Sequence, residues 1–449
     1  TYDSHAVNAF FSFANSISRY KTDQNNVEQT TIGNNTWCME SDMPKWNSNY
    51  YNQTINGGIS TELAKNHVVG ASLAYSKETD RWGGTSTSKM SYNADLFEDL
   101  YSNIHSHANY VQWIGNVFYN GTLTGKWKVA LNADYVNRRA NDDRTNHEQG
   151  SKTTQHETKN ENETSHDIYA GNVKVSYQAS KNLAFHVGTD ASYVDEKKDY
   201  SSFENEEHNS SSRLHAEESK FAVFAGCDFT IDRLSAQLGL RYETFDMQYR
   251  DALTQEALVD KMQRHLYPFF SLSLPVKNVE MGLSMSTKVK RPSYYELRNS
   301  EEYFNRYSIE AGNPWLLPQY TTDLSYSLQW YQLRFSVDYQ RINDYIISTN
   351  IIRQATPLVA VSKPDNLPHY SAINASVAYH TNVGIWEPYL NLNIMRTYLS
   401  LNNADGSKVK NDKPYFSMSF NNYLNLRHRW MPYLLISYNS DGNMREYRV

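Results

Sequence analysis

The chain has 449 residues, a formal net charge of -6, 39% hydrophobic residues and a mean hydropathy of -0.70. This charge leaves no basic footprint for nucleic acid, and no segment approaches the roughly 18 apolar residues that a transmembrane helix needs. The two cysteines, Cys38 and Cys227, lie 189 positions apart, which argues against a disulfide framework and against a zinc site with CxxC spacing. The low mean hydropathy is still compatible with a protein that spans a membrane with β-strands, because only about half of the residues in such a strand need to be apolar.

Segments in which apolar and polar residues alternate recur along the whole chain. In the clearest example, one face carries Leu234, Ala236, Leu238, Leu240 and Tyr242. The opposite face carries Ser235, Gln237, Gly239, Arg241 and Glu243. The same alternation predicts about seventeen strands, near residues 5–20, 51–64, 66–79, 109–124, 126–139, 166–180, 182–196, 217–232, 234–250, 264–276, 278–289, 320–331, 332–347, 370–384, 385–400, 413–427 and 429–440.

The connections between these predicted strands alternate between two kinds. Short breaks typical of tight hairpins lie at 64–66, 124–126, 180–182, 232–233 and 276–278. Long polar connections lie at 21–50, 80–108, 141–165 and 199–217. Outer-membrane barrels have short periplasmic turns and long extracellular loops, so this asymmetry predicts the orientation of the chain and places residue 1 on the periplasmic side.

The sequence therefore predicts an all-β fold, a transmembrane antiparallel up-and-down β-barrel in the outer membrane of a Gram-negative bacterium, with residues 1–449 in a single domain. The 35 tyrosines favour this prediction, because their amphipathic rings suit the girdles at the membrane interfaces. Bacterial single-chain barrels use even numbers of strands. The odd count predicts either one miscounted strand or a sheet that stops before closure.

Two sequence elements lie in one long connection after the strand predicted at 278–289. The first reads Arg-Pro-Ser-Tyr-Tyr-Glu-Leu at 291–297, and the second reads Gly-Asn-Pro-Trp-Leu-Leu-Pro at 312–318. With the hairpins around them, they resemble the barrel of TonB-dependent-receptor-like outer-membrane proteins of Bacteroidota, in which R-P-[ST]-x-x-[ED]-L precedes G-N-P-x-L-x-P. The resemblance is carried by Arg291, Pro292, Tyr294, Tyr295, Glu296, Leu297, Gly312, Asn313, Pro314, Leu316 and Pro318.

The resemblance implies a barrel of about 22 strands whose lumen is filled by a plug domain. It also implies three partners: outer-membrane lipid, the TonB complex acting through the plug, and an unidentified nutrient. No plug-like segment precedes residue 5, and too few strands follow the second element. The expectation is therefore a barrel fragment that lacks the plug and the C-terminal strands and that leaves an open sheet edge.

The residues of the two elements also support an interpretation that does not depend on the family resemblance. Pro292, Pro314 and Pro318 cannot donate to a strand ladder, and Gly312 and Asn313 tolerate positive φ. These residues predict an ordered, turn-rich excursion outside the sheet. The favoured interpretation is that the elements stabilise this one connection and contact no ligand.

Two polar connections contain clustered histidines that could ligate a metal. They are His147, His156 and His166 in one connection, and His208 and His215 in the other. Their spacings of nine, ten and seven residues match no metal-ligand motif, and charge-rich connections are usually only solvated. The sequence therefore predicts no metal and no cofactor.

Three further candidates are weaker. His186 and Asp190 share the lumen face of one strand, but four residues along a strand span about 13 Å, and no nucleophile motif accompanies them, so no catalytic residue is expected. Six aromatics, which could stack on a sugar, are more readily interface anchors: Trp37, Trp46, Tyr50, Tyr51, Trp82 and Trp315. Asp405 and Gly406 resemble part of a calcium loop, but the distal Glu is missing, so a plain turn is expected.

The leading functional hypothesis is the barrel portion of a TonB-dependent receptor that takes up an unidentified nutrient. The alternatives are a porin-like channel, an outer-membrane barrel enzyme or a soluble β-rich adhesin. The barrel is inferred from the residues, whereas the uptake function is implied by the resemblance.

Overall fold

The computed structural model describes residues 2–3, 7–32, 34–152, 155–254, 257–298, 301–305, 307–355, 358–402, 408–426, 430–445 and 447–448. The first strands are β1 (Tyr2–Asp3), β2 (Val7–Ile32), β3 (Asn35–Ala64), β4 (His67–Tyr92), β5 (Asp95–Thr124), β6 (Trp127–Gly150), β7 (His156–Ser180), β8 (Leu183–Glu204), β9 (Glu207–Ile231), β10 (Leu234–Asp251), β11 (Ala257–Val276) and β12 (Val279–Lys290). A short helix, α1 (Tyr294–Leu297), follows. The remaining strands are β13 (Glu301–Asn305), β14 (Ser308–Ala311), β15 (Gln319–Trp330), β16 (Leu333–Ala355), β17 (Leu358–His380), β18 (Trp386–Asn402), β19 (Lys408–Asn411), β20 (Tyr415–Leu424), β21 (Tyr433–Asn439), β22 (Asn443–Met444) and β23 (Tyr447–Arg448).

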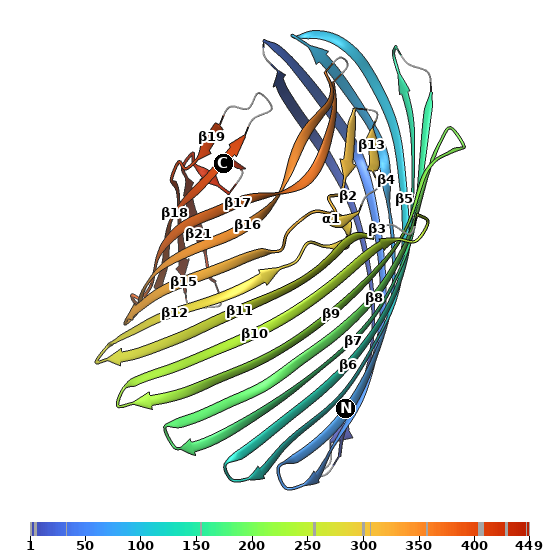
Figure 1. Cartoon of the computed structure of the whole chain (residues 1–449). Coiled ribbons are helices and arrows are strands. Elements are labelled where there is room, and N and C mark those ends of the chain that lie inside the picture. The colour runs from blue at the N-terminus through green and yellow to red at the C-terminus, as the bar shows by residue number, and fades with distance from the viewer. Residues whose placement is uncertain are drawn as a thin grey trace.

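Most of the strands form one strongly curved antiparallel wall (Figure 1). β22 and β23 form a separate two-stranded sheet, and β14 pairs in parallel with β17. Neighbours in the chain pair with each other from β2 to β12, and β12 then pairs directly with β15. The wall continues through β16, β17, β18, β20 and β21. The predicted all-β, up-and-down antiparallel fold is confirmed. In the described part of the chain, no helix has both the length and the apolar character to cross a membrane.

In the described part of the chain, seventeen strands follow one another across this wall, and each corresponds to one strand predicted from the alternation. They are β2 to β12, β15 to β18, β20 and β21. The five predicted short breaks are tight turns, and Asn66, Asp232 and Lys277 within them adopt φ of 65°, 54° and 54°. These polar residues take the left-handed conformation that tight hairpin turns require.

The polar connections at 21–50, 80–108, 141–165 and 199–217 are not loops, and this part of the prediction was wrong. The strands continue through them as paired ribbons that end in tight turns, with last pairs Ile32↔Asn35, Tyr92↔Asp95 and Glu204↔Glu207. The pairing of β6 with β7 ends at Glu148↔His156. In these ribbons the outer face contacts water instead of lipid and need not be apolar, so the alternation disappears while the backbone pairing persists. The other face is buried, as at Trp37, Met90 and Leu100.

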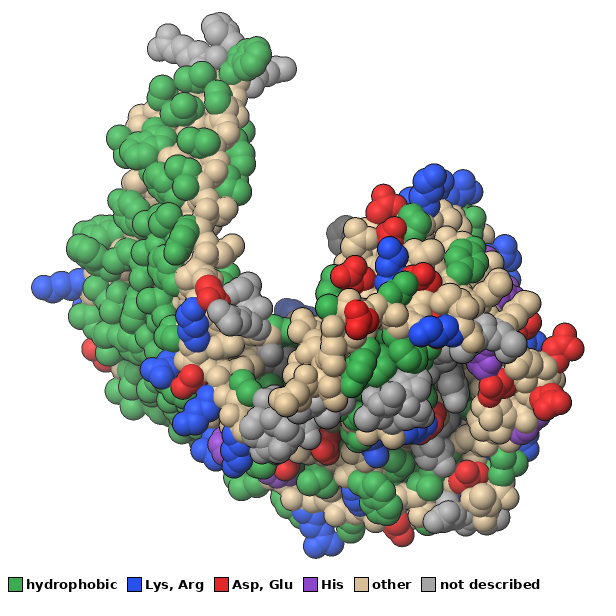
Figure 2. All heavy atoms as spheres, turned by 90° about the horizontal axis from the view of Figure 1, so that it is seen from above, with side chains coloured by type: hydrophobic (Ala, Val, Ile, Leu, Met, Phe, Trp, Pro, Cys, Tyr) green, Lys and Arg blue, Asp and Glu red, His purple; other side chains and the backbone are tan. Residues whose placement is uncertain are grey.

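The two faces of the wall have the polarity that the alternation predicted. On β10, Leu238, Leu240 and Tyr242 are 42%, 46% and 41% exposed on the outer face, whereas Glu243 on the inner face is only 5% exposed. Figure 2 shows hydrophobic side chains gathered along the outside of the curved wall. This outer face suits the hydrocarbon of a bilayer.

Aromatic side chains border the outer apolar band. Tyr135 and Tyr169 lie with ring centroids 5.0 Å apart, and the Tyr135 hydroxyl donates a hydrogen bond to Asp167 at 2.7 Å. Nearer the short turns, Trp127 and Tyr177 lie with centroids 4.6 Å apart. Apolar ring bodies that carry polar tips at the edges of an apolar band form interface girdles.

The wall is open between its first and last strands. Over the described residues, β21 pairs only with β20, and β2 pairs with β3 and, over two residue pairs, with β1. No described pairing joins β21 to β2. The expected open sheet with unpaired edge strands is therefore found.

Candidate functional site

Residues 291–318 leave the path of the wall and fold against its concave inner face. The expected excursion outside the sheet holds only in part, because β14 pairs in parallel with β17 from Ser308↔Ala360 to Glu310↔Ser362. Because Lys290 pairs directly with Gln319, this segment is an insertion between two neighbouring strands, β12 and β15. Figure 1 shows α1 and β13 inside the curve of the wall. We call residues 291–318 the inward segment. It contains both of the sequence elements that suggested a family.

Apolar side chains anchor the inward segment to the wall. Leu297 and Leu316 are 2% and 3% exposed and pack in one cluster with Phe245, Tyr249 and Ile346. Phe245 and Tyr249 lie on the same face of β10 as Glu243, which identifies this face as the lumen side. The inward segment thus has its own small core against the lumen wall.

A capping box explains why a helix begins at Tyr294. The Ser293 hydroxyl accepts from the backbone N–H of Glu296, and the Glu296 carboxylate accepts from the Ser293 N–H at 2.7 Å. The sequence signal for this box, Ser-Tyr-Tyr-Glu at 293–296, was present but not used in predicting the element. The side chain of Tyr294 lies outside the described residues.

The Gly-Asn-Pro element is held by close backbone contacts. A Cβ atom on Gly312 would lie 2.1 Å from the Arg298 carbonyl oxygen, so only glycine fits there. The Asn313 N–H donates to the Glu296 carbonyl at 2.6 Å, and its amide donates to the Pro364 carbonyl at 3.0 Å. Neither Gly312 nor Asn313 has positive φ, so the expectation that they form a left-handed turn was wrong. Glycine is required at 312 because the Arg298 backbone approaches it closely.

The rest of this element turns back towards the sheet. Pro314 follows Asn313 in a turn, and Pro318 is buried just before β15 begins. The Leu317 N–H donates to the Asn366 side chain of β17 at 2.7 Å. Trp315 is 70% exposed and contributes little to packing.

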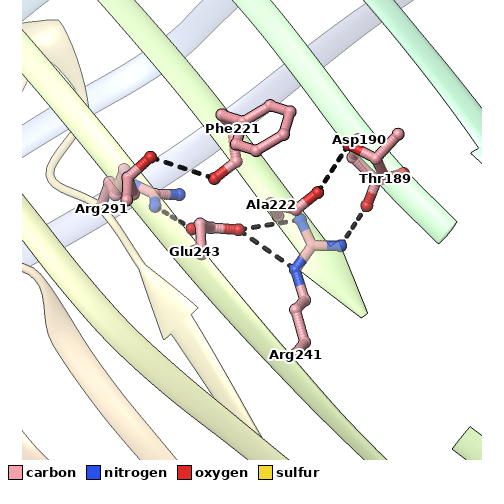
Figure 3. Close-up of polar contacts among 8 residues, drawn as sticks. Thr189, Asp190, Phe221, Ala222, Arg241, Glu243 and Arg291 are labelled. Carbon is pink, nitrogen blue, oxygen red and sulfur yellow. Dashed lines mark hydrogen bonds and ion pairs between the residues drawn. The ribbon is translucent and has the colours of Figure 1, made fainter. Parts of the chain in front are cut away.

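Charged side chains pin the start of the inward segment to the lumen wall. Arg291 forms an ion pair with Glu243, and its guanidinium lies 3.9 Å from the centre of the Phe245 ring. Glu243 also accepts two hydrogen bonds from Arg241, at 3.2 and 2.9 Å, and Arg241 pairs with Asp190 (Figure 3). The network joins strands β8 and β10 to the first residue of the segment.

A second charged cluster lies around Arg298, which is 1% exposed. Its guanidinium stacks on the Tyr295 ring at 3.6 Å, donates to the Tyr295 carbonyl at 2.6 Å, and lies 4.0 and 3.7 Å from carboxylate oxygens of Glu302 and Glu310. Opposite this cluster, Tyr200 of β8 donates to the Glu301 carbonyl at 2.9 Å, and burial raises the pKa of its hydroxyl to about 12. The Arg298 cluster therefore holds the inward segment together, and the Tyr200 hydrogen bond ties its middle to the wall.

The clustered histidines pair individually with carboxylates. The pairs are His147–Glu157 at 3.2 Å, His156–Glu204 at 3.3 Å, His166–Glu196 at 3.0 Å and His215–Asp195 at 2.7 Å. Among the residues that the structure describes, no three potential ligands gather into a metal site. His208 instead lies edge-on to Phe203.

The remaining sequence candidates are dispersed. His186 contacts Ser176 and Asp228, at 2.8 and 2.9 Å, whereas Asp190 pairs with Arg241, so the two do not act together. Both cysteines are free. The segment around Asp405 and Gly406 lies outside the described residues.

The loop aromatics also have separate environments. Trp37 is 2% exposed in a core cluster, and Trp46 and Trp82 stack on each other at 5.7 Å. Tyr50 and Tyr51 are half-buried on β3. These six residues do not form one ligand platform.

Comparison with known families decides the identity of the wall. Residues 136–449, well over half of the chain, match the model of the outer membrane protein beta-barrel family. The chain belongs to this family. Its place in the outer membrane follows, and the resemblance inferred from the two elements is confirmed at the level of the barrel. No curated protein sequence matches the chain.

Solved structures share the fold of this family member. The copper transporter OprC superposes with a TM-score of 0.53 at 10% identity, over 93% of this chain and 68% of that chain. The siderophore receptor PiuA from Acinetobacter baumannii superposes with a TM-score of 0.53 at 10% identity, over 97% of this chain and 74% of that chain. The ferric yersiniabactin uptake receptor FyuA from Yersinia pestis superposes with a TM-score of 0.52 at 11% identity, over 98% of this chain and 69% of that chain. At such identities the likeness concerns the fold alone.

Proposed function

We propose that this barrel forms the membrane-spanning wall of a TonB-dependent receptor that imports a nutrient into the periplasm. The observation that carries the proposal is the size of the wall. Seventeen strands cross it, and β2 and β21 still remain unpaired to each other in the described structure. Channels of the porin type close with 16 to 18 strands, whereas transporters with a plugged lumen use about 22.

The names of the similar solved structures support an uptake role, since they describe a copper transporter, a siderophore receptor and a ferric yersiniabactin uptake receptor. An importer of this kind needs a plug domain to couple TonB to ligand release. We infer that residues 1–449 belong to one barrel domain whose closure requires further strands. No enzyme activity is proposed.

Within this receptor, the Arg-Pro and Gly-Asn-Pro elements are proposed to hold the inward segment in the lumen. Arg291 and Leu297 fix its beginning, and Gly312, Asn313 and Leu316 fix its end. A segment anchored at both ends narrows the lumen and brings its own side chains towards any passing ligand.

Two measurements test the import function in the source bacterium and with the purified whole protein. Deletion of the gene should abolish growth on the nutrient that the receptor imports. Inactivation of TonB should produce the same growth defect. In planar bilayers, the whole protein should give no steady open conductance, because a plug closes the lumen. Steady stepwise conductance, together with growth that does not require TonB, would establish a passive channel instead.

A further inference from the structure

A cavity of about 690 Å³ lies beside the inward segment. Residues of the inward segment, of the β16–β17 hairpin and of the β22–β23 hairpin line it. Small-molecule sites typically have volumes of about 300–1,000 Å³, so the cavity has the size of a ligand site.

One side of the cavity is apolar. Ile342, Tyr345 and Ile347 are 5%, 6% and 8% exposed and belong to one buried cluster, with Leu401 packed against it. The Tyr345 ring stacks on Tyr370 at a centroid distance of 5.1 Å. This wall suits the apolar body of a ligand.

The acidic side chains around the cavity have partners within the protein, whereas two of its basic side chains have none in the described structure. The two carboxylates of the lining are occupied within the protein: Glu296 caps α1, and Glu310 accepts from the Tyr295 hydroxyl. Lys290 and Arg445 are exposed at the cavity, and neither has an ion pair or a side-chain hydrogen bond among the described residues. The cavity therefore offers two cations without carboxylate partners.

Arg298 adds a third cation to the lining. It is 1% exposed, and its Nε atom is buried without a hydrogen-bond partner. Its two nearest carboxylates, on Glu302 and Glu310, lie at 4.0 and 3.7 Å, beyond ordinary hydrogen-bond distance. A buried donor of this kind favours an acceptor from outside the protein.

We propose that this cavity binds an amphiphilic anion, a small molecule with an apolar or aromatic body and a carboxylate. The body packs on the Ile342–Tyr345 wall, and the carboxylate lies between Lys290 and Arg445. This inference rests on the proposed import function, because it names the ligand class of that receptor.

Indole-3-acetate and its neutral analogue indole-3-acetamide are suitable probes, since they differ only in the charge of one group. Titration calorimetry with the whole chain in lipid nanodiscs, with empty nanodiscs as the blank, should show the acid binding about tenfold or more tightly than the amide, because charge-assisted hydrogen bonds are the stronger kind. The K290Q/R445Q double variant should lose this preference. Both side chains are exposed, so the variant should fold normally.

Lys288 supplies the matched control, because it lies on the same face of β12 two residues earlier and pairs with Asp323 at 3.4 Å. K288Q should retain the preference for the acid. Equal binding of acid and amide, or an unchanged preference in K290Q/R445Q, would overturn the proposal. These binding measurements need neither TonB nor a plug, so their failure leaves the import function standing, and loss of import leaves them unaffected.

Discussion

At the scale of single residues, the inward segment depends on contacts between positions that are distant in the sequence. Gly312 packs on the Arg298 backbone, and Arg291 reaches back to Glu243 across 48 residues. A sequence shows which of its residues are glycine or arginine, but it does not show which backbone a glycine approaches. This is why the two elements could be recognised as an ordered excursion while their contacts could not be predicted.

Replacing Gly312 by alanine should destabilise the barrel by about 1–3 kcal/mol, the usual cost of forcing extra atoms into a packed site. The new Cβ would meet the carbonyl oxygen of Arg298, which cannot move without disturbing α1. Gly115→Ala is the control, because a Cβ there has no heavy atom within 4 Å. Equal free energies of unfolding for the two variants, measured reversibly in lipid, would show that the close approach is not tight.

At the scale of elements, the alternation on β10 assigns each residue to lipid or lumen. Leu238→Arg should cost about 2–4 kcal/mol of barrel stability, because it places a charge in hydrocarbon, whereas Gln237→Arg on the lumen face should cost little. Unfolding in lipid of a complete version of the protein measures both. If the two substitutions cost the same, the assignment of faces is wrong.

The alternation of turns and extended ribbons gives each connection a side of the membrane. A cysteine at Ser151, beyond the end of β6, should react with an impermeant thiol reagent on intact cells, and one at Lys181, in the turn before β8, should not. Both variants need a background in which Cys38 and Cys227 are replaced by serine. Labelling of Lys181→Cys alone would reverse the proposed orientation.

The sequence predicted which strands form the wall, but it did not predict how long they are. The alternation between 182 and 196 identified β8, because lipid on one face enforces a period of two, but it missed the extension of this strand to Glu204. In the extension no lipid contacts the outer face, so the residues are free of that constraint, although Tyr200 and Ser202 on the other face are buried. Tyr200 lies in this extension, and its contact with Glu301 joins two strands too distant in the chain for pattern reasoning to connect.

At the scale of the whole molecule, the wall combines a lipid-compatible outer face, a polar lumen face and an inward segment that carries the candidate ligand cavity. The edges of this wall are its weak points, since every unpaired backbone group within hydrocarbon costs several kcal/mol. Edge pairing therefore decides whether residues 1–449 behave as a stable membrane protein.

Hydrogen exchange of residues 1–449 in detergent should expose these edges directly. In an antiparallel strand, alternate amides point to opposite neighbours. Over most of β2, and on β21, about half of the amides should therefore exchange rapidly, whereas β6, which is paired on both sides, should be protected throughout. Full protection of β2 and β21 would mean that the two edges meet in a closed barrel of the porin size class, and a passive channel would then explain the molecule better than a receptor.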